Sequence, residues 1–187
     1  MKNITETIQN LSGGNIQDAQ EILNVFEPVH MRKNQYLLKE GQICSSYYFI
    51  ESGTVRLFHT KDSNEYTVWM GTAGEFFTNL ESYLDGSKSK INIHAIEPSL
   101  VYIIDKRKSD ILAKTSNHYN TLLRKTVEMA FVGLSKNIMS YQSEEAIERY
   151  HRLMDEKNWI EKYPLKYLSS FIGITQSTLS RIRAKKG

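Results

Sequence analysis

Residues 164–183 read PLKYLSSFIGITQSTLSRIR, a pattern that predicts two short helices joined by a tight turn. Apolar residues recur at helical spacing in both halves and would form the inner faces of the pair: Leu165, Leu168, Ile172, Leu179 and Ile182. Pro164 suits the first turn of a helix, Gly173 permits a left-handed turn conformation, and Thr175 can cap the second helix. We therefore expect this segment to fold as a helical pair.

The outward face of the second predicted helix carries side chains that can contact DNA. A helix held by a preceding helix can lie in the major groove, where Gln bonds adenine and Arg bonds guanine, each pair discriminating by about 1–3 kcal/mol. The predicted base-reading residues are Gln176, Ser177, Ser180 and Arg181, and the predicted phosphate contacts are Lys166, Thr175, Thr178 and Arg183. The alternative is a helical hairpin that only completes a core.

The positive charge of the chain is concentrated at the same end. The 187 residues carry a net charge of +3, but residues 164–187 contain five basic and no acidic residues, which leaves −2 for residues 1–163. With 40% hydrophobic and 24% charged residues, the composition is that of a folded protein with one large domain, or one medium and one small domain. The charge alone fits a solvated basic terminus equally well, so the DNA prediction depends on the helical pattern.

Residues 29–105 predict β-structure. Six short runs rich in β-branched and aromatic residues are separated by turn residues: 36–38, 46–50, 54–59, 66–70, 91–96 and 100–104. In the run 91–96, Ile91 and Ile93 alternate with Asn92 and His94, which predicts a strand buried on one face only. Many short strands at this spacing favour a sandwich, a jelly roll or a barrel over a parallel α/β fold.

Helical periods flank the strand region on both sides. Residues 15–25 predict a helix that Asn15 caps and Pro28 ends, and residues 144–157 predict another. Between them, an apolar stripe predicts a helix of roughly 25 residues: Leu123, Val127, Phe131, Leu134, Ile138 and Tyr141. Small residues form a second stripe beside it: Thr126, Ala130, Gly133 and Asn137. Two usable faces predict pairing with a second copy, and burial within one chain is the alternative.

The single cysteine, Cys44, limits the site chemistry. One thiol cannot build an intramolecular disulfide, a four-cysteine zinc site or an all-cysteine iron–sulfur cluster. We therefore expect a reducing, cytoplasmic location, and residues 1–10 also lack the apolar segment of a signal peptide. No run approaches the roughly 18 apolar residues of a membrane span, so no membrane association is expected.

Four segments occur along the chain in a characteristic order: KNQYLLKEG at 33–41, YFIESGTVR at 48–56, GEF at 74–76 and GITQSTLSRIR at 173–183. With these segments, residues 15–187 resemble the CRP/FNR family of bacterial transcription regulators. The resemblance implies an α+β chain with an N-terminal double-stranded β-helix (a jelly roll of the cyclic-nucleotide-binding type), a long dimerisation helix and a C-terminal all-α helix-turn-helix domain. The expected boundaries are 1–108, 109–141 and 142–187.

The resemblance also implies where an effector would bind, and the chain departs from the family pattern there. Cyclic-nucleotide-responsive members hold the ribose with Gly-Glu-Leu, the cyclic phosphate with Arg-Ser and the purine with a polar pair on the long helix. The corresponding residues here are Thr78, Asn79 and Leu80, then Ser89 and Lys90, then Lys136 and Asn137. Lys replaces a two-pronged Arg only as a point charge, so cyclic AMP is not expected. The iron–sulfur cysteines of the FNR branch are absent from the sequence. Haem binding is not excluded by the count of five histidines, which are dispersed along the chain.

The sequence therefore predicts a homodimeric regulator, not an enzyme, that binds near-palindromic promoter DNA and contacts RNA polymerase if it activates transcription. Its β roll would sense a small-molecule effector of unknown identity. Gln176 and Ser177 replace an Arg-Glu pair of the cyclic-AMP-responsive type, whereas Arg181 matches, so no operator sequence is implied. One alternative is a ligand-binding roll without a transcriptional role. Another is a cupin-like metal-dependent enzyme, although the sequence has no H-x-H pair and residues 47–53 offer only Glu51 as an obvious metal ligand.

Overall fold

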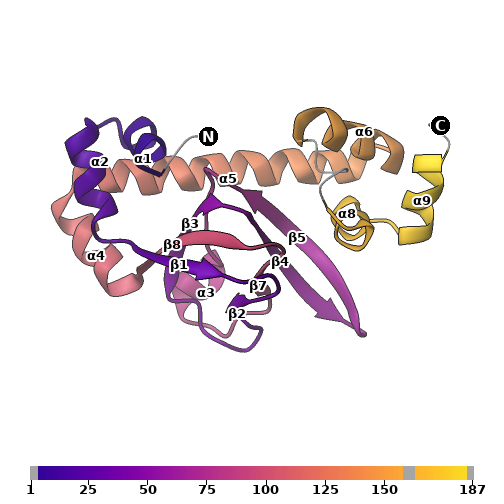
Figure 1. The fold of residues 1–187 in the computed structure, drawn as a ribbon, viewed down its shortest axis with the longest axis horizontal. Coiled ribbons are helices and arrows are strands. Elements are labelled where there is room, and N and C mark those ends of the chain that lie inside the picture. Colours follow the sequence, from indigo (N-terminus) through magenta and orange to yellow (C-terminus); the bar gives the residue numbers. More distant parts are fainter. Residues whose placement is uncertain (1–3, 158–162, 185–187) are drawn as a thin grey trace. The chain divides into compact units, whose positions relative to one another are not determined.

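The structure, a computed structural model, describes residues 4–157 and 163–184. The chain divides into two units: the first comprises Met1–Leu57 and Met70–Ala130, and the second comprises Phe58–Trp69 and Phe131–Gly187. One long helix, α5 (Asn117–Ser143), belongs to both units and is continuous along its 27 residues (Figure 1). This confirms the predicted long helix.

The strands form two four-stranded sheets with the orders β1-β8-β3-β6 and β2-β7-β4-β5, a jelly roll. Their bounds are β1 (Glu27–Met31), β2 (Tyr36–Leu38), β3 (Ser46–Ser52), β4 (Thr54–Lys61), β5 (Asn64–Thr72), β6 (Phe76–Phe77), β7 (Asn92–Ala95) and β8 (Ser99–Asp105). The pairs β1–β8, β2–β7, β3–β6 and β3–β8 are antiparallel. All six predicted strands are present, and the jelly-roll prediction is confirmed.

Two strands lie outside the predicted set. Pro28, which is expected to end a helix, lies inside β1 opposite Tyr102 of β8. The proline occurs where proline is tolerated in sheets, because β1 is an edge strand and pairs with a neighbour on one side only. The two-residue strand β6 pairs Phe77 with Tyr48 and is too short to give a sequence pattern.

The prediction that the run 91–96 is buried on one face only is wrong. All four residues of β7 are buried, including the polar Asn92 and His94. The Asn92 side-chain oxygen accepts a hydrogen bond from the Glu40 amide at 3.0 Å, and the His94 ring lies 5.5 Å from the Tyr36 ring. The polar side chains are therefore covered by neighbouring segments of the chain rather than by water.

Helices of the first unit build its main core against β3 and β8. These helices are α1 (Ile4–Ser12), α2 (Ile16–Leu23), α3 (Leu80–Asp85) and α4 (Lys106–Thr115), and Figure 1 shows α1 and α2 beside one end of α5. The core includes the fully buried side chains Ile8, Ile22, Phe49, Ile104 and Tyr119. The Asn15 side chain caps α2 by accepting from the Gln17 and Asp18 amides, as predicted. Helix α1 is not predicted, because polar residues obscure its apolar face.

Among its described residues, the second unit contains the end of α5, the tip of the β4–β5 hairpin and three further helices. These are α6 (Ala146–Lys157), which matches the helix predicted at 144–157, then α8 (Leu165–Ile172) and α9 (Gln176–Ala184). Within the described ranges, no helix is long and apolar enough to cross a membrane.

Candidate nucleic-acid interface

Helices α8 and α9 pack through the inner faces that the sequence predicts. Leu168, Ile172 and Leu179 are each at most 1% exposed. Between the helices, Gly173 adopts the left-handed conformation with a φ of 83°, and its amide and that of Ile174 both donate to the Ser169 carbonyl at 3.0 Å. This pattern ends α8 and reverses the chain within a few residues. Pro164 precedes α8 as its N-cap residue rather than lying in its first turn.

Thr175 begins α9. Its hydroxyl accepts a hydrogen bond from the Thr178 amide at 3.1 Å, so the predicted cap is confirmed. The same hydroxyl lies 2.9 Å from the hydroxyls of Ser177 and Thr178. The cap satisfies one amide at the N-terminal end of α9, which is the end that would enter a groove.

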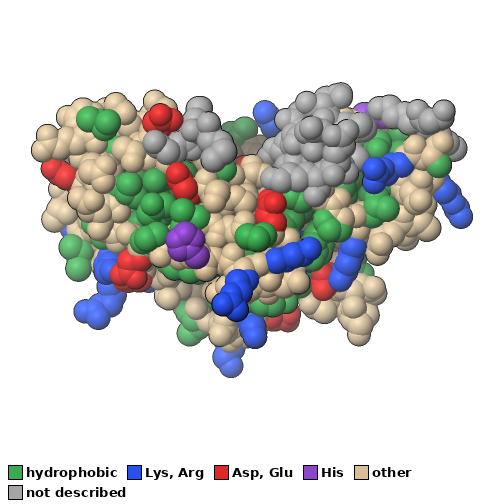
Figure 2. All heavy atoms as spheres, viewed as in Figure 1, with side chains coloured by type: hydrophobic (Ala, Val, Ile, Leu, Met, Phe, Trp, Pro, Cys, Tyr) green, Lys and Arg blue, Asp and Glu red, His purple; other side chains and the backbone are tan. Residues whose placement is uncertain are grey.

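Every residue predicted to contact DNA is exposed: Lys166, Thr175, Gln176, Ser177, Thr178, Ser180, Arg181 and Arg183. Seven of them come together on α9 and its cap, whereas Lys166 lies on α8. Figure 2 shows Lys and Arg side chains in blue standing out from the part of the molecule that α9 forms. Arg181 and Arg183 lie in the last turn of α9, where cations also favour the helix dipole.

Arg149 of α6 holds this helical pair to the end of α5. Its guanidinium donates to the Ile172 carbonyl at 3.0 Å and to the Glu144 carbonyl, and it lies 5.1 Å from the centre of the Tyr141 ring. The Tyr141 hydroxyl in turn donates to the Phe171 carbonyl. Burial raises the pKa of Tyr141, and the nearby Arg149 opposes this shift. Sequence reasoning misses Arg149, because its acceptors are backbone carbonyls.

The side chains around Glu144 strengthen the same junction. The Ser140 hydroxyl donates to the Glu144 carboxylate at 2.5 Å, and Arg152 donates to the Ser140 hydroxyl at 2.7 Å. The Ser140 hydrogen bond is the main cause of a lowered pKa for Glu144, and Arg152 adds to it. The carboxylate is therefore stabilised in its charged form where α5 ends.

A second contact that sequence reasoning misses joins the β4–β5 hairpin to α8. The Ser170 hydroxyl accepts from the Thr67 amide at 2.7 Å and donates to the Glu65 carbonyl at 2.9 Å. Lys166 Nζ lies 3.2 Å from a Glu65 carboxylate oxygen. One of the predicted phosphate contacts is therefore already paired with a carboxylate.

The predicted effector residues of the first unit lie around α3 and the segment that follows it. The Asn79 side-chain amide donates to the Ser89 hydroxyl at 2.7 Å, and both residues are buried. Thr78 donates to the Ser46 carbonyl at 2.8 Å, and Lys90 pairs with Glu81 at 3.1 Å on the surface. Leu80 is 38% exposed. The groups expected to hold a ribose and a phosphate thus bond to other groups of the chain.

Lys136 and Asn137 belong to the second unit. Asn137 lines a space of about 10 Å³ beside Tyr141 and Arg149, which is at the lower limit for one water molecule. The structure therefore does not group these two residues with the other predicted effector contacts in one unit.

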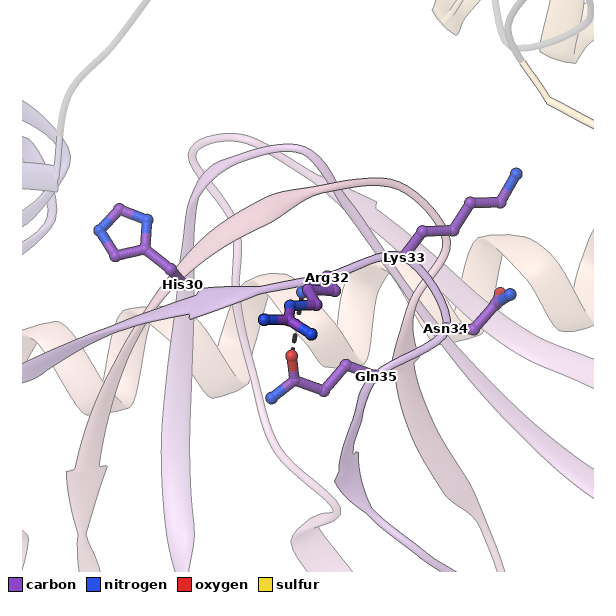
Figure 3. Close-up of a pocket in the computed structure, with 5 residues that line it drawn as sticks. All are labelled: His30, Arg32, Lys33, Asn34 and Gln35. Atoms are coloured by element: carbon purple, nitrogen blue, oxygen red, sulfur yellow. Dashed lines mark hydrogen bonds between the residues drawn. The ribbon is translucent and has the colours of Figure 1, made fainter.

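An open hollow of about 600 Å³ lies at the connection between β1 and β2. It is lined by His30, Arg32, Lys33, Asn34 and Gln35. Figure 3 shows that these side chains do not converge on one point: Lys33 and Asn34 extend away from His30. The single hydrogen bond drawn there joins the Arg32 amide to Gln35 at 2.9 Å and only closes the turn.

The described residues contain no group of three or more His, Cys, Asp or Glu side chains placed to hold a metal ion. Cys44 is buried and lies 3.4 Å from the Thr78 hydroxyl.

The apolar stripe on α5 is open to solvent in the single chain. Val127, Phe131, Leu134 and Ile138 are between 41% and 69% exposed. Leu123, in contrast, packs against the core of the first unit. Contiguous exposed apolar side chains on one helix are typical of an interaction surface.

Comparisons with known proteins agree with this architecture. Residues 28–116 match the family described as the cyclic nucleotide-binding domain. Structures with a similar fold include the c-di-GMP responsive global regulator CLP of Xanthomonas campestris, with 13% identity, 91% of each chain covered and a TM-score of 0.72. FixK2 from Bradyrhizobium japonicum has 15% identity over 86% of this chain and 84% of its own, with a TM-score of 0.73.

A candidate regulator of the CRP/FNR family from Eubacterium rectale has 15% identity over 90% of this chain and 81% of its own, with a TM-score of 0.69. No curated protein sequence matches the chain significantly. Residues 28–116 therefore match a cyclic nucleotide-binding domain, and the chain has a fold that is also found in CRP/FNR-family transcription regulators.

Proposed function

We propose that this chain is a homodimeric, sequence-specific DNA-binding regulator of the CRP/FNR type. Its helix-turn-helix would be α8, the Gly173 turn and α9, within a DNA-binding domain at residues 142–187. The observation that carries this proposal is the two-sided character of α9: Leu179 is fully buried, while Gln176 and Arg181 are exposed on a helix that is capped and held by its neighbour.

The exposed residues divide into two roles. Gln176, Ser177, Ser180 and Arg181 would reach base edges in the major groove. Lys166, Thr175, Thr178 and Arg183 would contact phosphates, which position the duplex without reading its sequence. Residues 164–187 hold no acidic side chain, so no carboxylate side chain in this segment would repel the DNA phosphates.

Dimerisation would follow from the connecting helix at residues 109–141. Its exposed stripe, formed by Val127, Phe131, Leu134 and Ile138, would pack against the same stripe of a second copy. Two-fold symmetry would place the two α9 helices about 34 Å apart, facing successive major grooves of a near-palindrome. RNA polymerase would be a further partner if the protein activates transcription, and a cytoplasmic location follows from the same role.

The β roll at residues 1–108 would sense an effector other than cyclic AMP or serve as a scaffold. The hydrogen bond between the buried Asn79 and Ser89 supports this. These residues correspond to those that hold the ribose and the cyclic phosphate in cyclic-nucleotide-responsive members, and here they bind each other. No catalytic role is proposed for the chain.

The test is selection of binding sites from a pool of random duplexes by the purified chain, followed by a salt series. We expect a near-palindromic site and a log–log salt slope of about −0.9 for each phosphate neutralised. Arg181→Ala and Gln176→Ala should relax the selected sequence. Arg124→Ala, which removes an exposed arginine paired with Glu128 on α5, is the matched control and should not. Unchanged sequence preference in Arg181→Ala and Gln176→Ala would refute the proposal.

A further inference from the structure

The tip of the β4–β5 hairpin, residues 58–69, contacts α8, the helix that precedes the Gly173 turn. Because α8 carries Lys166, a predicted phosphate contact, this contact concerns the proposed DNA interface. Ser170 on α8 takes the place of a strand neighbour: its hydroxyl bonds the Thr67 amide and the Glu65 carbonyl at 2.7 and 2.9 Å. Both backbone groups belong to β5. One side chain thus fixes the register between the hairpin and α8.

This register brings the Glu65 carboxylate to Lys166. The ammonium of Lys166 lies 3.2 Å from Glu65 Oε1, with the Lys166 side chain 55% and the Glu65 side chain 29% exposed. The pair is accessible to water and to a ligand. An exposed ion pair is weak enough to exchange partners.

We propose that the hairpin restrains DNA binding by holding Lys166 in place of a DNA phosphate. This inference rests on the proposed function, because it concerns the regulation of the same interface. A carboxylate and a phosphate both bind an ammonium through an anionic oxygen. Bringing a phosphate to Lys166 while Glu65 remains would place two anions against one cation, which their mutual repulsion disfavours. The docked hairpin and the bound duplex therefore compete for one side chain.

The connection of the hairpin to the β roll would allow the roll to regulate this competition. Strands β4 and β5 both continue into the β roll, so the hairpin is a covalent extension of the roll. A change in the roll that withdraws the hairpin would release Lys166 for a phosphate.

The experiment measures affinity for duplex DNA without a selected sequence, because a phosphate contact is independent of base sequence. Glu65→Gln keeps the shape of the side chain and removes its charge. We expect it to raise affinity by about 1.5- to 5-fold per protomer, the range that an exposed ion pair supports. Ser170→Ala removes the two hydrogen bonds to the hairpin and leaves Lys166 unaltered, so it should also raise the affinity for DNA.

Two comparisons isolate the effect. In a Lys166→Ala background, Glu65→Gln should leave affinity unchanged, because the contested ammonium is gone. Glu81→Gln, which removes the carboxylate paired with Lys90 in the first unit, should also leave it unchanged. Circular dichroism of each variant checks that it is folded.

The possible outcomes separate this inference from the proposed function. If the unaltered chain selects a site through Arg181 but Glu65→Gln gains no affinity for DNA, the restraint by the hairpin is refuted, while the proposed function as a DNA-binding regulator is retained. A gain that persists without Lys166 refutes the exchange of partners, and a loss of affinity in Ser170→Ala shows that the hairpin supports the interface instead. If the unaltered chain binds no DNA, both proposals fail.

Discussion

Replacing Arg149 by alanine should destabilise the second unit by about 3 kcal/mol. The guanidinium donates to the Ile172 carbonyl at 3.0 Å and to the Glu144 carbonyl, and hydrogen bonds from charged donors contribute about 1.5–3 kcal/mol each. Its contact with the Tyr141 ring, 5.1 Å from the centre, adds about 0.5–1 kcal/mol. Because Arg149 is only partly buried, water replaces part of these interactions in the variant, so the expected loss lies slightly below the sum of their lower limits, which is about 3.5 kcal/mol.

Urea unfolding followed by circular dichroism measures the effect. With an m-value of about 1.5 kcal/mol per molar urea for a unit of this size, the midpoint should fall by about 2 M. Amide hydrogen exchange should rise in α8 and at Gly173, which locates the loss at the junction. Arg149→Lys should lose about half as much, since an ammonium cannot supply the two-pronged geometry of a guanidinium.

Arg124→Ala is the control, because Arg124 is an exposed arginine paired with Glu128 at 2.7 Å on α5. Such a pair contributes about 0.3–0.5 kcal/mol, so this variant should unfold close to the unaltered chain. The reasoning is refuted if Arg149→Ala is within about 0.5 kcal/mol of the unaltered protein, or if the two arginine variants lose the same amount.

Three further predictions concern the turn, the long helix and the roll. Gly173→Ala should cost at least about 1–2 kcal/mol, because a side chain at a φ of 83° is strained and its Cβ would lie 3.2 Å from the Tyr141 ring; a thermal melt without a lower Tm would contradict this. The double variant Phe131→Asp/Leu134→Asp should give a monomer in sedimentation, whereas Met129→Asp, on another side of α5, should remain a dimer like the unaltered chain. Equal masses for the unaltered chain and both variants would count against the stripe. Burial raises the pKa of Tyr47 to about 12, so the folded state favours the neutral phenol. The free energy of unfolding should therefore fall as the pH rises from about 10, the pKa of an unfolded tyrosine, to about 12. In alkaline titrations of unfolding, Tyr47→Phe should lessen this fall, and an unchanged pH dependence would contradict the prediction.

The sequence predicts features whose causes are local. Asn15 and Thr175 are caps in the structure because the acceptor and the amide it binds are at most three residues apart. Gly173 is in the left-handed conformation for the same kind of reason, since the backbone around one residue determines it. Alternation and composition likewise suffice to find six strands.

Features that depend on distant partners are not predicted. The contact of Ser170 with Thr67 joins residues 103 positions apart, and nothing in either local sequence marks it. The one-sided burial expected for β7 is wrong because neighbouring segments cover both of its faces, which the alternation of Asn92 and His94 cannot report. For the candidate site, the exposed face of α9 is predictable, whereas the support from Arg149 and the pairing of Lys166 with Glu65 require the folded chain.

The continuity of α5 sets a geometric rule for changes in its length. Its residues up to Ala130 belong to the first unit and those from Phe131 to the second, without a break in the helix. Each residue inserted at this boundary would turn the part of α5 beyond it by about 100° about the helix axis and move that part by about 1.5 Å. Seven inserted residues would restore the phase to within about 20°. Natural relatives with longer or shorter helices here should therefore differ in steps that keep the helical phase, so the length of α5 is constrained even where its individual side chains are free to vary.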